Sequence, residues 1–395
     1  MSLKKLVLKK REDKRLRAGH LWIFSNEIDT KKTPLKDFDP GQCVNVYSDN
    51  NKYIATAYIN PNTLITARVY SHKIDTGLDQ AWFENQFSTC LSLREKIYQE
   101  PYYRFCFSEG DYVPGLIIDR YDKTWVLQIN TAGMALKQNL IIDALKSIAD
   151  VQQIILRNDS AARKLELLEM ETSIIPEKPI EPIVIKENNS SYLIDPIKGQ
   201  KTGWFYDQRV NRSNMFKWVR DKTVLDVFSY TGSWSISAAN AGAKSVIAID
   251  ASESALSFVN ENAEINKVQD KIKTLCADAF NALQKLVDEK QQYDVIFVDP
   301  PAFIKRKKDL KQGQQAYLRI NKLAMKLVKP GGILISSSCS YHMKQAELQN
   351  TLLMASRQLN RRLQLIEIGQ QGPDHPIHPA ITETAYLKCI TCRVM

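Results

Sequence analysis

The sequence predicts an α/β protein whose C-terminal part is a doubly wound, Rossmann-like sheet, preceded by a small β-barrel and a central α+β domain. One strand–turn–helix–strand unit, from Thr223 to Asp250, has the pattern of a β-α-β element. Short β-rich runs separated by turn residues fill the first 73 residues. The length of 395 residues is too great for one ordinary core. We therefore expect domains at residues 1–73, 74–180 and 181–395.

The first domain contains three β-rich runs, Cys43–Tyr47, Tyr53–Ile59 and Ile65–Tyr70, with Asp-Pro-Gly, Ser-Asp-Asn-Asn and Asn-Pro-Asn turns around them. Regular turn signals around short strands are typical of a small barrel. Trp22 and Phe24 are two residues apart, so they share one face of a strand. We expect both in the barrel core rather than as platforms for stacked bases.

The charge of the chain is uneven. The net charge is +10, and residues 1–73 hold 14 Lys or Arg against 7 Asp or Glu. Clustered positive charge predicts a polyanionic partner, because each neutralised phosphate releases counterions. This favours nucleic acid over a solubility charge, and over a membrane, for which no amphipathic anchor is visible.

The composition is that of a soluble globular protein, with 44% hydrophobic and 25% charged residues, and the cysteine usage leads us to expect a cytoplasmic location. No apolar run approaches the ~18 residues that span a bilayer, and the basic N-terminus lacks the apolar stretch of a secretory signal. The seven cysteines have no framework spacing, which fits a reducing compartment.

The central segment predicts a helix over Leu78–Tyr98, a hairpin, and a Leu- and Glu-rich helix over Ala161–Met170. It contains no catalytic constellation, so spacing or substrate docking is its expected role. Proline-rich residues Ile175–Pro182 are the expected linker.

The turn between Asp226 and Gly232 is the predicted ligand site, because ligands of such sheets lie beyond the carboxyl ends of the strands. Gly232 is its only glycine, whereas pyrophosphate sites need a G-x-G-x-x-G turn. Asp250 follows Asp226 by 24 residues, near the ~20-residue offset of an acid that binds ribose hydroxyls. A nucleoside-like ligand without phosphates fits, and S-adenosylmethionine is the common one. The alternative is a sheet whose strands happen to end in acids.

Two further strand ends carry candidate residues. Asp278 and Ala279 follow the strand Ile272–Cys276, and Asp278 could equally be only the N-cap of the next helix. The strand Tyr293–Val298 ends in Asp299-Pro300-Pro301-Ala302-Phe303, where two prolines remove backbone donors and stiffen the chain.

Cys339 ends the next strand, so we expect it beside Asp299. A cysteine is more often inert core, but this position suits a reactive thiolate. His375 and His378 are separated by a proline and lack a third ligand, and Cys389-Ile390-Thr391-Cys392 is a lone C-x-x-C. We expect no metal.

The order of these parts resembles one family. Gly19 to Phe24 with Asp39-Pro40-Gly41 resembles a PUA domain, a module that binds structured RNA. Lys201-Thr202-Gly203-Trp204-Phe205-Tyr206-Asp207-Gln208-Arg209 is similar to a motif just upstream of the cofactor strand in the bacterial 23S ribosomal RNA large-subunit methyltransferase I family. The resemblance implies a class I methyltransferase domain that uses S-adenosylmethionine to form 5-methylcytidine, with 23S ribosomal RNA as partner and no membrane or metal. A homodimer is left open.

The resemblance also implies roles for residues. Cys339 would add to carbon 6 of cytosine, and Asp299 would hold N3 and the 4-amino group. Gln208 and Arg209 would edge the pocket, although they could simply form a polar cluster capping a helix over Gln208–Arg220. The expected cofactor-binding residues are Gln208, Asp226, Phe228, Ser229, Tyr230, Gly232, Asp250, Asp278, Ala279 and Asp299, and the expected substrate-binding residues are Pro300, Phe303 and Arg209.

One departure leaves alternatives open. Many RNA 5-methylcytidine enzymes have a second cysteine directly after the two prolines, where this chain has Ala302. A runner-up reaction is methylation of an exocyclic amine, with the Pro300 carbonyl orienting the amine and Phe303 stacking on the ring. A catalytically degenerate RNA-binding assembly factor is the alternative from another class.

Overall fold

A computed structural model describes residues 2–395, and its contacts divide the chain into two compact units. The first unit consists of the chain up to Glu181 together with Pro196–Trp204 and Pro373–Thr384. The second consists of Pro182–Asp195, Phe205–Gly372 and Ala385–Met395. Each unit is therefore built from segments that are distant in sequence. The boundaries expected near residues 74 and 180 stay a prediction.

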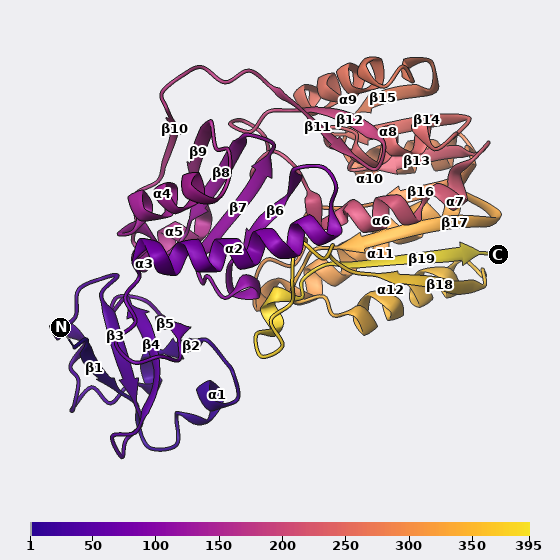
Figure 1. Ribbon diagram of the computed structural model, residues 1–395. Coiled ribbons are helices and arrows are strands. Elements are labelled where there is room, and N and C mark those ends of the chain that lie inside the picture. Colours follow the sequence, from indigo (N-terminus) through magenta and orange to yellow (C-terminus); the bar gives the residue numbers. More distant parts are fainter. Residues whose placement is uncertain (1) are drawn as a thin grey trace. The chain divides into compact units, whose positions relative to one another are not determined.

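The first unit contains a five-stranded sheet in the order β1-β3-β4-β5-β2 (Figure 1). Its strands are β1 Lys4–Val7, β2 Trp22–Phe24, β3 Cys43–Tyr47, β4 Tyr53–Ile59 and β5 Ile65–Ser71, with the short helix α1 Lys14–Arg17. The three β-rich runs predicted from the sequence are thus strands. Alternate residues such as Leu6, Val44 and Val46 are fully buried in its core.

The expectation for Trp22 and Phe24 is met only in part: Trp22 packs against the core of the first sheet, but neither ring is fully buried. Ile23 between them is fully buried, so its neighbours lie on the other face of β2 and are only half-buried. The indole Nε1 of Trp22 donates to Glu109 at 2.8 Å, and the Arg15 guanidinium lies 4.9 Å from the Phe24 ring centre. Polar partners therefore occupy the aromatic face that the sequence assigned to the core.

A second five-stranded sheet in the same unit has the order β10-β9-β8-β7-β6. Its strands are β6 Tyr102–Phe107, β7 Leu116–Tyr121, β8 Thr124–Ile129, β9 Gln153–Asn158 and β10 Glu171–Ile175, and its helices are α2 Gln80–Ile97, α3 Ala132–Ala135, α4 Gln138–Ile148 and α5 Ala161–Leu165. Phe83 and Phe87 of α2 pack with Tyr58 and Tyr70 of the barrel strands in one apolar cluster. The barrel and this sheet therefore share buried contacts.

The helix expected over Ala161–Met170 is too long. It ends at Leu165, Leu167 has a positive φ of 59°, and the chain continues as β10, antiparallel to β9. The guanidinium of Arg163 donates to the Glu169 carbonyl at 2.8 Å. A side chain thus bonds the backbone where another helical turn would have formed.

The second unit is built on a seven-stranded sheet in the order β15-β14-β13-β16-β17-β19-β18 (Figure 1). Its strands are β13 Thr223–Val227, β14 Ser245–Asp250, β15 Ile272–Cys276, β16 Tyr293–Val298, β17 Val328–Ser338, β18 Leu363–Gly369 and β19 Lys388–Val394. β13 to β17 are parallel, while β19 is antiparallel to both β17 and β18. The doubly wound sheet predicted from the sequence is confirmed.

Helices cover this sheet in two groups that follow from the strand order. The chain winds outward from β13 to β15 and then crosses back to β16, so right-handed crossovers place the two groups on opposite faces. The helices are α6 Arg209–Asn214, α7 Phe216–Val219, α8 Ser233–Asn240 and α9 Glu253–Ile265, followed by α10 Ala279–Asp288, α11 Leu310–Leu327 and α12 Gln345–Gln358. The hairpin of β11 Ile183–Glu187 and β12 Ser190–Ile194 completes the unit.

Among residues 2–395, none of the helices combines the length and the apolar character that a bilayer crossing needs.

Candidate active site

The candidate site lies where β13 and β16 run side by side. These strands pair in parallel register, with Val227 beside Val298, so their carboxyl ends reach the same edge of the sheet. The strand order reverses at this pair, and such a switch point opens a crevice for ligands. Asp299 begins the segment after β16, and its backbone N–H donates to the Val227 carbonyl at 3.3 Å.

The turn after β13 is held in an unusual backbone shape. Phe228, Tyr230 and Gly232 have φ values of 67°, 49° and 86°. Left-handed conformations are unfavourable for residues with a Cβ, by about 1 to 2 kcal/mol each, and strain of this kind concentrates at functional sites. A Cβ added at Gly232 would lie 3.2 Å from Val259, so glycine also allows α9 to approach. The turn therefore exposes its backbone to the crevice at the start of α8.

Unpartnered polar atoms gather at this turn. Asp226 is fully buried, and its Oδ2 accepts from the Ser235 hydroxyl at 2.6 Å while its Oδ1 has no partner. The hydroxyls of Ser229 and Thr231 are also buried and unpartnered. Buried polar atoms in proteins are nearly always hydrogen-bonded, so such a cluster fits a ligand with several polar groups. An adenosyl cofactor with an amino-acid tail has such groups.

Burial raises the pKa of Asp226 to about 7. The Ser235 hydroxyl opposes this rise by hydrogen bonding, whereas the charges of Asp299 and Asp250 add to it. A carboxyl group that titrates near neutrality inside a crevice is a common mark of a functional site. A cationic ligand would stabilise the ionised form of this side chain.

The other two acids are already hydrogen-bonded to the backbone. Asp250 accepts from the N–H groups of Tyr230 and Ser252, each at 2.9 Å, and therefore fixes the shape of the turn. Asp278 is exposed and accepts from the Asn281 N–H at 3.0 Å, which confirms it as the N-cap of α10. Each carboxylate still has lone pairs to offer a ligand. Ala279 is buried beneath Asp278 in the first turn of α10.

Asp299 has a partner on each oxygen. Oδ1 accepts from Nε2 of Gln208 at 2.9 Å, and Oδ2 accepts from the indole Nε1 of Trp234 at 3.1 Å. Burial raises the pKa of Asp299, and the nearby Asp207 raises it further, whereas Trp234, Gln208 and Arg212 act in the opposite direction. These two donors fix the orientation of the carboxyl group, which an acid that hydrogen-bonds to the edge of a base requires.

The thiol of Cys339 lies close to the same segment. Its Sγ is 3.9 Å from the carbonyl oxygen of Pro300, so the end of β17 and the Pro-Pro turn after β16 are neighbours. Cys339 is half-buried and leaves part of its surface accessible. The expected proximity of this sulfur to the Asp299 segment is therefore present in the structure.

An aromatic cluster closes the side of the site next to α10 and α11. The ring of Phe303 lies 6.2 Å from that of Phe228, 6.1 Å from Phe280 and 4.9 Å from Tyr317, measured between ring centres. Phe303 is only partly buried, so one part of its ring is available for a planar ligand.

Arg209 is engaged away from the strand ends. Its Nε lies 3.3 Å from Glu187, a fully buried carboxylate that also takes Nε of Arg212 at 2.6 Å. Gln208, by contrast, donates to Asp299, and its Oε1 accepts from Nδ2 of Asn211 at 2.7 Å. The helix expected over Gln208–Arg220 is divided at Met215 into α6 and α7.

The structure thus brings most of the sequence candidates together at one sheet edge, in the segments after β13, β14, β16 and β17. Sequence reasoning missed Trp234, Ser235 and Glu187. Trp234 and Ser235 follow the turn directly, so an indole and a hydroxyl in the first turn of α8 were a usable signal. Glu187 ends β11, in a hairpin outside the seven-stranded sheet, and no local pattern marks it.

A basic surface lies on the first unit. We call it the α1 surface; its residues line one hollow and are Lys10, Arg11, Asp13, Lys14, Arg17, Asp49, Asn50 and Lys52. Arg17 pairs with Asp13 at 2.6 Å across exposed side chains, and the remaining cations outnumber the acids. Such an excess suits phosphate oxygens of a nucleic-acid backbone.

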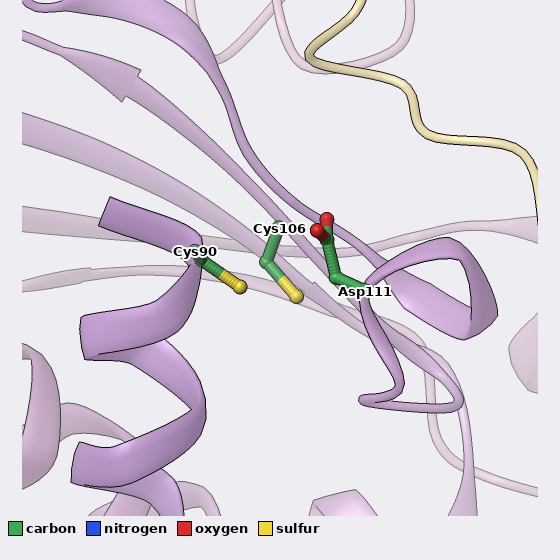
Figure 2. A group of neighbouring side chains, drawn as sticks. All are labelled: Cys90, Cys106 and Asp111. Carbon is green, nitrogen blue, oxygen red and sulfur yellow. The ribbon is translucent and has the colours of Figure 1, made fainter. Parts of the chain in front are cut away.

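One group in the first unit has the composition of a metal site. Figure 2 shows Cys90 on α2, Cys106 on β6 and Asp111 just after β6, with the sulfur of Cys90 directed toward Cys106. One ligand atom of each lies within 4.8 Å of the others. Both oxygens of Asp111 accept from the buried Arg94, at 2.7 and 2.6 Å. A cation would have to displace this guanidinium, so the arrangement is better described as an ion pair beside two thiols.

Comparisons with known proteins agree with this geometry. Residues 6–72 match the model of a PUA-like domain, and residues 151–391, more than half of the chain, match the model of an S-adenosylmethionine-dependent methyltransferase. A structure from Streptococcus mutans described as a SAM-dependent methyltransferase has a TM-score of 0.82 at 20% identity, covering 99% of this chain and 100% of that chain. SMU.776, a structure complexed with SAH, has the same TM-score at 21% identity and the same coverage. At these identities the likeness concerns the fold.

Curated relatives are more similar in sequence. Ribosomal RNA large subunit methyltransferase I of Aliivibrio fischeri strain MJ11 is 36% identical over 99% of both chains. The protein of the same name from Vibrio parahaemolyticus is 35% identical, and that from Cronobacter sakazakii 33%, each over 99% of both chains.

Together, the doubly wound sheet, the turn after β13 and the matched domain model define an S-adenosylmethionine-dependent methyltransferase. Within this class, the chain belongs to the ribosomal RNA large subunit methyltransferase I family. The resemblance stated from the sequence and the prediction of S-adenosylmethionine as cofactor are confirmed.

Proposed function

We propose that this protein methylates carbon 5 of a cytidine in 23S ribosomal RNA, with Cys339 as the nucleophile. The observation that carries the proposal is the Sγ of Cys339, 3.9 Å from the carbonyl of Pro300, the residue that follows Asp299. The thiol of Cys339 and the carboxyl group of Asp299, which two N–H donors hold in place, could therefore contact the same planar ligand. The names of the relatives support ribosomal RNA as the substrate class.

The reaction needs a nucleophile because carbon 5 of cytosine is too electron-poor to attack a methyl donor. The thiolate of Cys339 adds to carbon 6, and electron density moves to carbon 5 and N3. S-adenosylmethionine, when bound, supplies the electrophilic methyl group. Water then takes the carbon 5 proton, the thiolate leaves carbon 6, the double bond between carbons 5 and 6 is restored, and N3 returns its proton to Asp299.

Asp299 would stabilise the charge that develops on the base during this addition. Because burial raises its pKa, the neutral acid can donate to N3 as charge develops there, and an oxygen can accept from the 4-amino group. The cofactor-binding set remains as predicted, with the unpartnered atoms of Asp226 and Ser229 as the strongest support. The Pro300 carbonyl and the Phe303 ring would contact the base.

Substrate binding would be shared with the PUA-like domain. The α1 surface supplies cations for the phosphate backbone, whereas the target nucleotide must leave its helix to reach the strand ends. The three-domain division and the homodimer stay predictions, and the mass of the protein in solution, from light scattering, tests the latter.

Replacement of Cys339 by Ala tests the reaction. We expect turnover on unmodified 23S ribosomal RNA to fall by at least about 10³-fold, because a nucleophile cannot be partly replaced. The wild-type protein should also form a covalent adduct with RNA containing 5-fluorocytidine, and Cys339→Ala should not. Cofactor affinity, measured by calorimetry, should be unchanged. Cys276→Ala, at an exposed cysteine, is the matched control.

A second candidate reaction is methylation of an exocyclic amine, which Ala302 favours because the usual second cysteine is missing. Asp299 and the Pro300 carbonyl would then orient the amine, and no thiol would be needed. Unaltered turnover of Cys339→Ala would refute the nucleophile and support this reaction. Absence of any cofactor binding would instead indicate an assembly factor.

A further inference from the structure

Lys388 is a buried cation beside the candidate nucleophile. It begins β19, opposite Ser338 at the end of β17, in an antiparallel pair. Its side chain is only 7% exposed, and its Nζ donates to the carbonyl of Ser340 at 2.6 Å and to that of Tyr386 at 2.7 Å. Ser340 is the residue after Cys339, so the ammonium lies under the loop that carries the thiol.

Among residues 2–395, only two of the three N–H donors of the Lys388 ammonium group have a hydrogen-bond acceptor. An ammonium group has three N–H donors, and two of them end on carbonyls. Within residues 2–395, no carboxylate oxygen lies within 4.0 Å of its Nζ. Buried lysines are normally paired, because an isolated ammonium is costly in a low-dielectric interior. An anion is therefore to be expected close by.

The surrounding charges identify that anion. Burial lowers the pKa of Lys388 to about 8, while the negative charge that Cys339 would carry as a thiolate and the charge of Glu347 of α12 raise it. On the α11 side, Cys339 likewise raises the pKa of the buried Tyr317. The negative charges of Asp299, which precedes Pro300, and of Glu347 would disfavour a thiolate, and the ammonium of Lys388 opposes them.

We propose that Lys388 is a positioning residue that stabilises Cys339 as a thiolate and fixes the loop that aims it. The thiol proton leaves to solvent, and Lys388 keeps its own proton and remains cationic. The inference rests on the proposed function, since it assigns a role to the nucleophile named there. It adds an activating residue that lies about 50 positions further along the chain.

The test measures the thiol itself rather than turnover. The rate of alkylation of Cys339 by iodoacetamide is followed from pH 6 to pH 10 by mass spectrometry of its peptide, in the full-length protein. An opposite charge within ~4–6 Å lowers a thiol pKa by about 1 to 3 units. We expect the midpoint for Cys339 to lie at least one pH unit lower in the wild type than in Lys388→Met, and Lys388→Arg to restore most of the difference.

Controls separate charge from folding. Lys329→Met removes a lysine that pairs with Asp294 at 2.9 Å near the start of β17, and it should leave the midpoint unchanged. The exposed Cys276 is an internal reference, so the wild type alone remains informative if Lys388→Met does not fold. A midpoint for wild-type Cys339 at or above that of Cys276, or equal midpoints in folded wild type and Lys388→Met, overturns the inference.

The two hypotheses fail separately. If Cys339→Ala keeps its turnover while the alkylation midpoint still depends on Lys388, the nucleophile is refuted but the ion pair stands. If Cys339→Ala is inactive while the midpoint ignores Lys388, the nucleophile stands and the role of Lys388 is refuted. If both hypotheses hold, Lys388→Met lowers kcat by a larger factor than it raises KM. In the plot of kcat against pH, the rise on the acid side then occurs at higher pH in this variant than in the wild type.

Discussion

Replacement of Asp226 by Asn should abolish the pH dependence that this side chain imposes on the free energy of unfolding. Asp226 is fully buried, and burial raises its pKa from 3.8 to about 7. A group whose pKa is raised in the folded state stabilises the fold below its unfolded pKa. That stability is lost as the pH rises toward the folded pKa. The affected window therefore extends from about pH 4 to pH 7.

The magnitude follows from the two pKa values. A difference of 3.2 units between 3.8 and about 7 corresponds to about 4 kcal/mol when the group is fully ionised. Between pH 5 and pH 8, the loss is about 2.5 kcal/mol. Asn keeps the shape and can still accept from Ser235, but it does not titrate. The stability of Asp226→Asn relative to the wild type should therefore rise by about 2.5 kcal/mol over this interval, whatever constant difference the amide introduces.

Urea denaturation of the protein without cofactor, at pH 5, 6, 7 and 8, measures this difference. Asp288→Asn, at an exposed position of α10, is the matched control and should show no such trend. A free-energy difference between wild type and Asp226→Asn that stays constant from pH 5 to pH 8 would contradict the reasoning. If Asp226 also binds the cofactor as proposed, the same variant will bind S-adenosylmethionine more weakly, even at pH 8, where its stability relative to the wild type is highest.

Two further variants test the buried ion pairs of Glu187 and the α1 surface. Glu187→Gln removes the negative charge that pairs with the buried guanidiniums of Arg209 and Arg212. We expect the free energy of unfolding, measured by urea denaturation, to fall by about 3 to 5 kcal/mol. A change below about 1 kcal/mol would contradict this expectation. The double variant Lys14→Ala, Arg17→Ala should bind ribosomal RNA more weakly, because it removes two cations of the α1 surface. In filter-binding assays at several salt concentrations, the slope of log affinity against log salt should decrease by about 1 to 2. An unchanged slope would exclude the α1 surface from the RNA interface.

Local chemistry explains which parts of the fold the sequence could predict. A few residues of sequence are enough to recognise the β-branched run Thr223–Val227, the turn after it and the small-residue helix α8. The same applies to the two prolines that fix Asp299. The positive φ angles of Phe228 and Tyr230 were not predictable, because aromatic residues rarely adopt them. They depend on partners such as Asp250, which holds the Tyr230 N–H from a neighbouring strand.

Period-two patterns predict which face a strand residue occupies, but not which strand lies beside it, and this limit matters most at β19. β19 comes last in sequence, yet it is inserted between β17 and β18, antiparallel to both. This register sets Lys388 opposite Ser338, next to Cys339. No local signal distinguishes Lys388 from a solvated lysine at the start of a strand. The candidate nucleophile Cys339 can thus be predicted from its place at the end of one strand. The cation proposed to activate it is brought there by the pairing of β17 with β19, and strand pairing depends on the whole sheet.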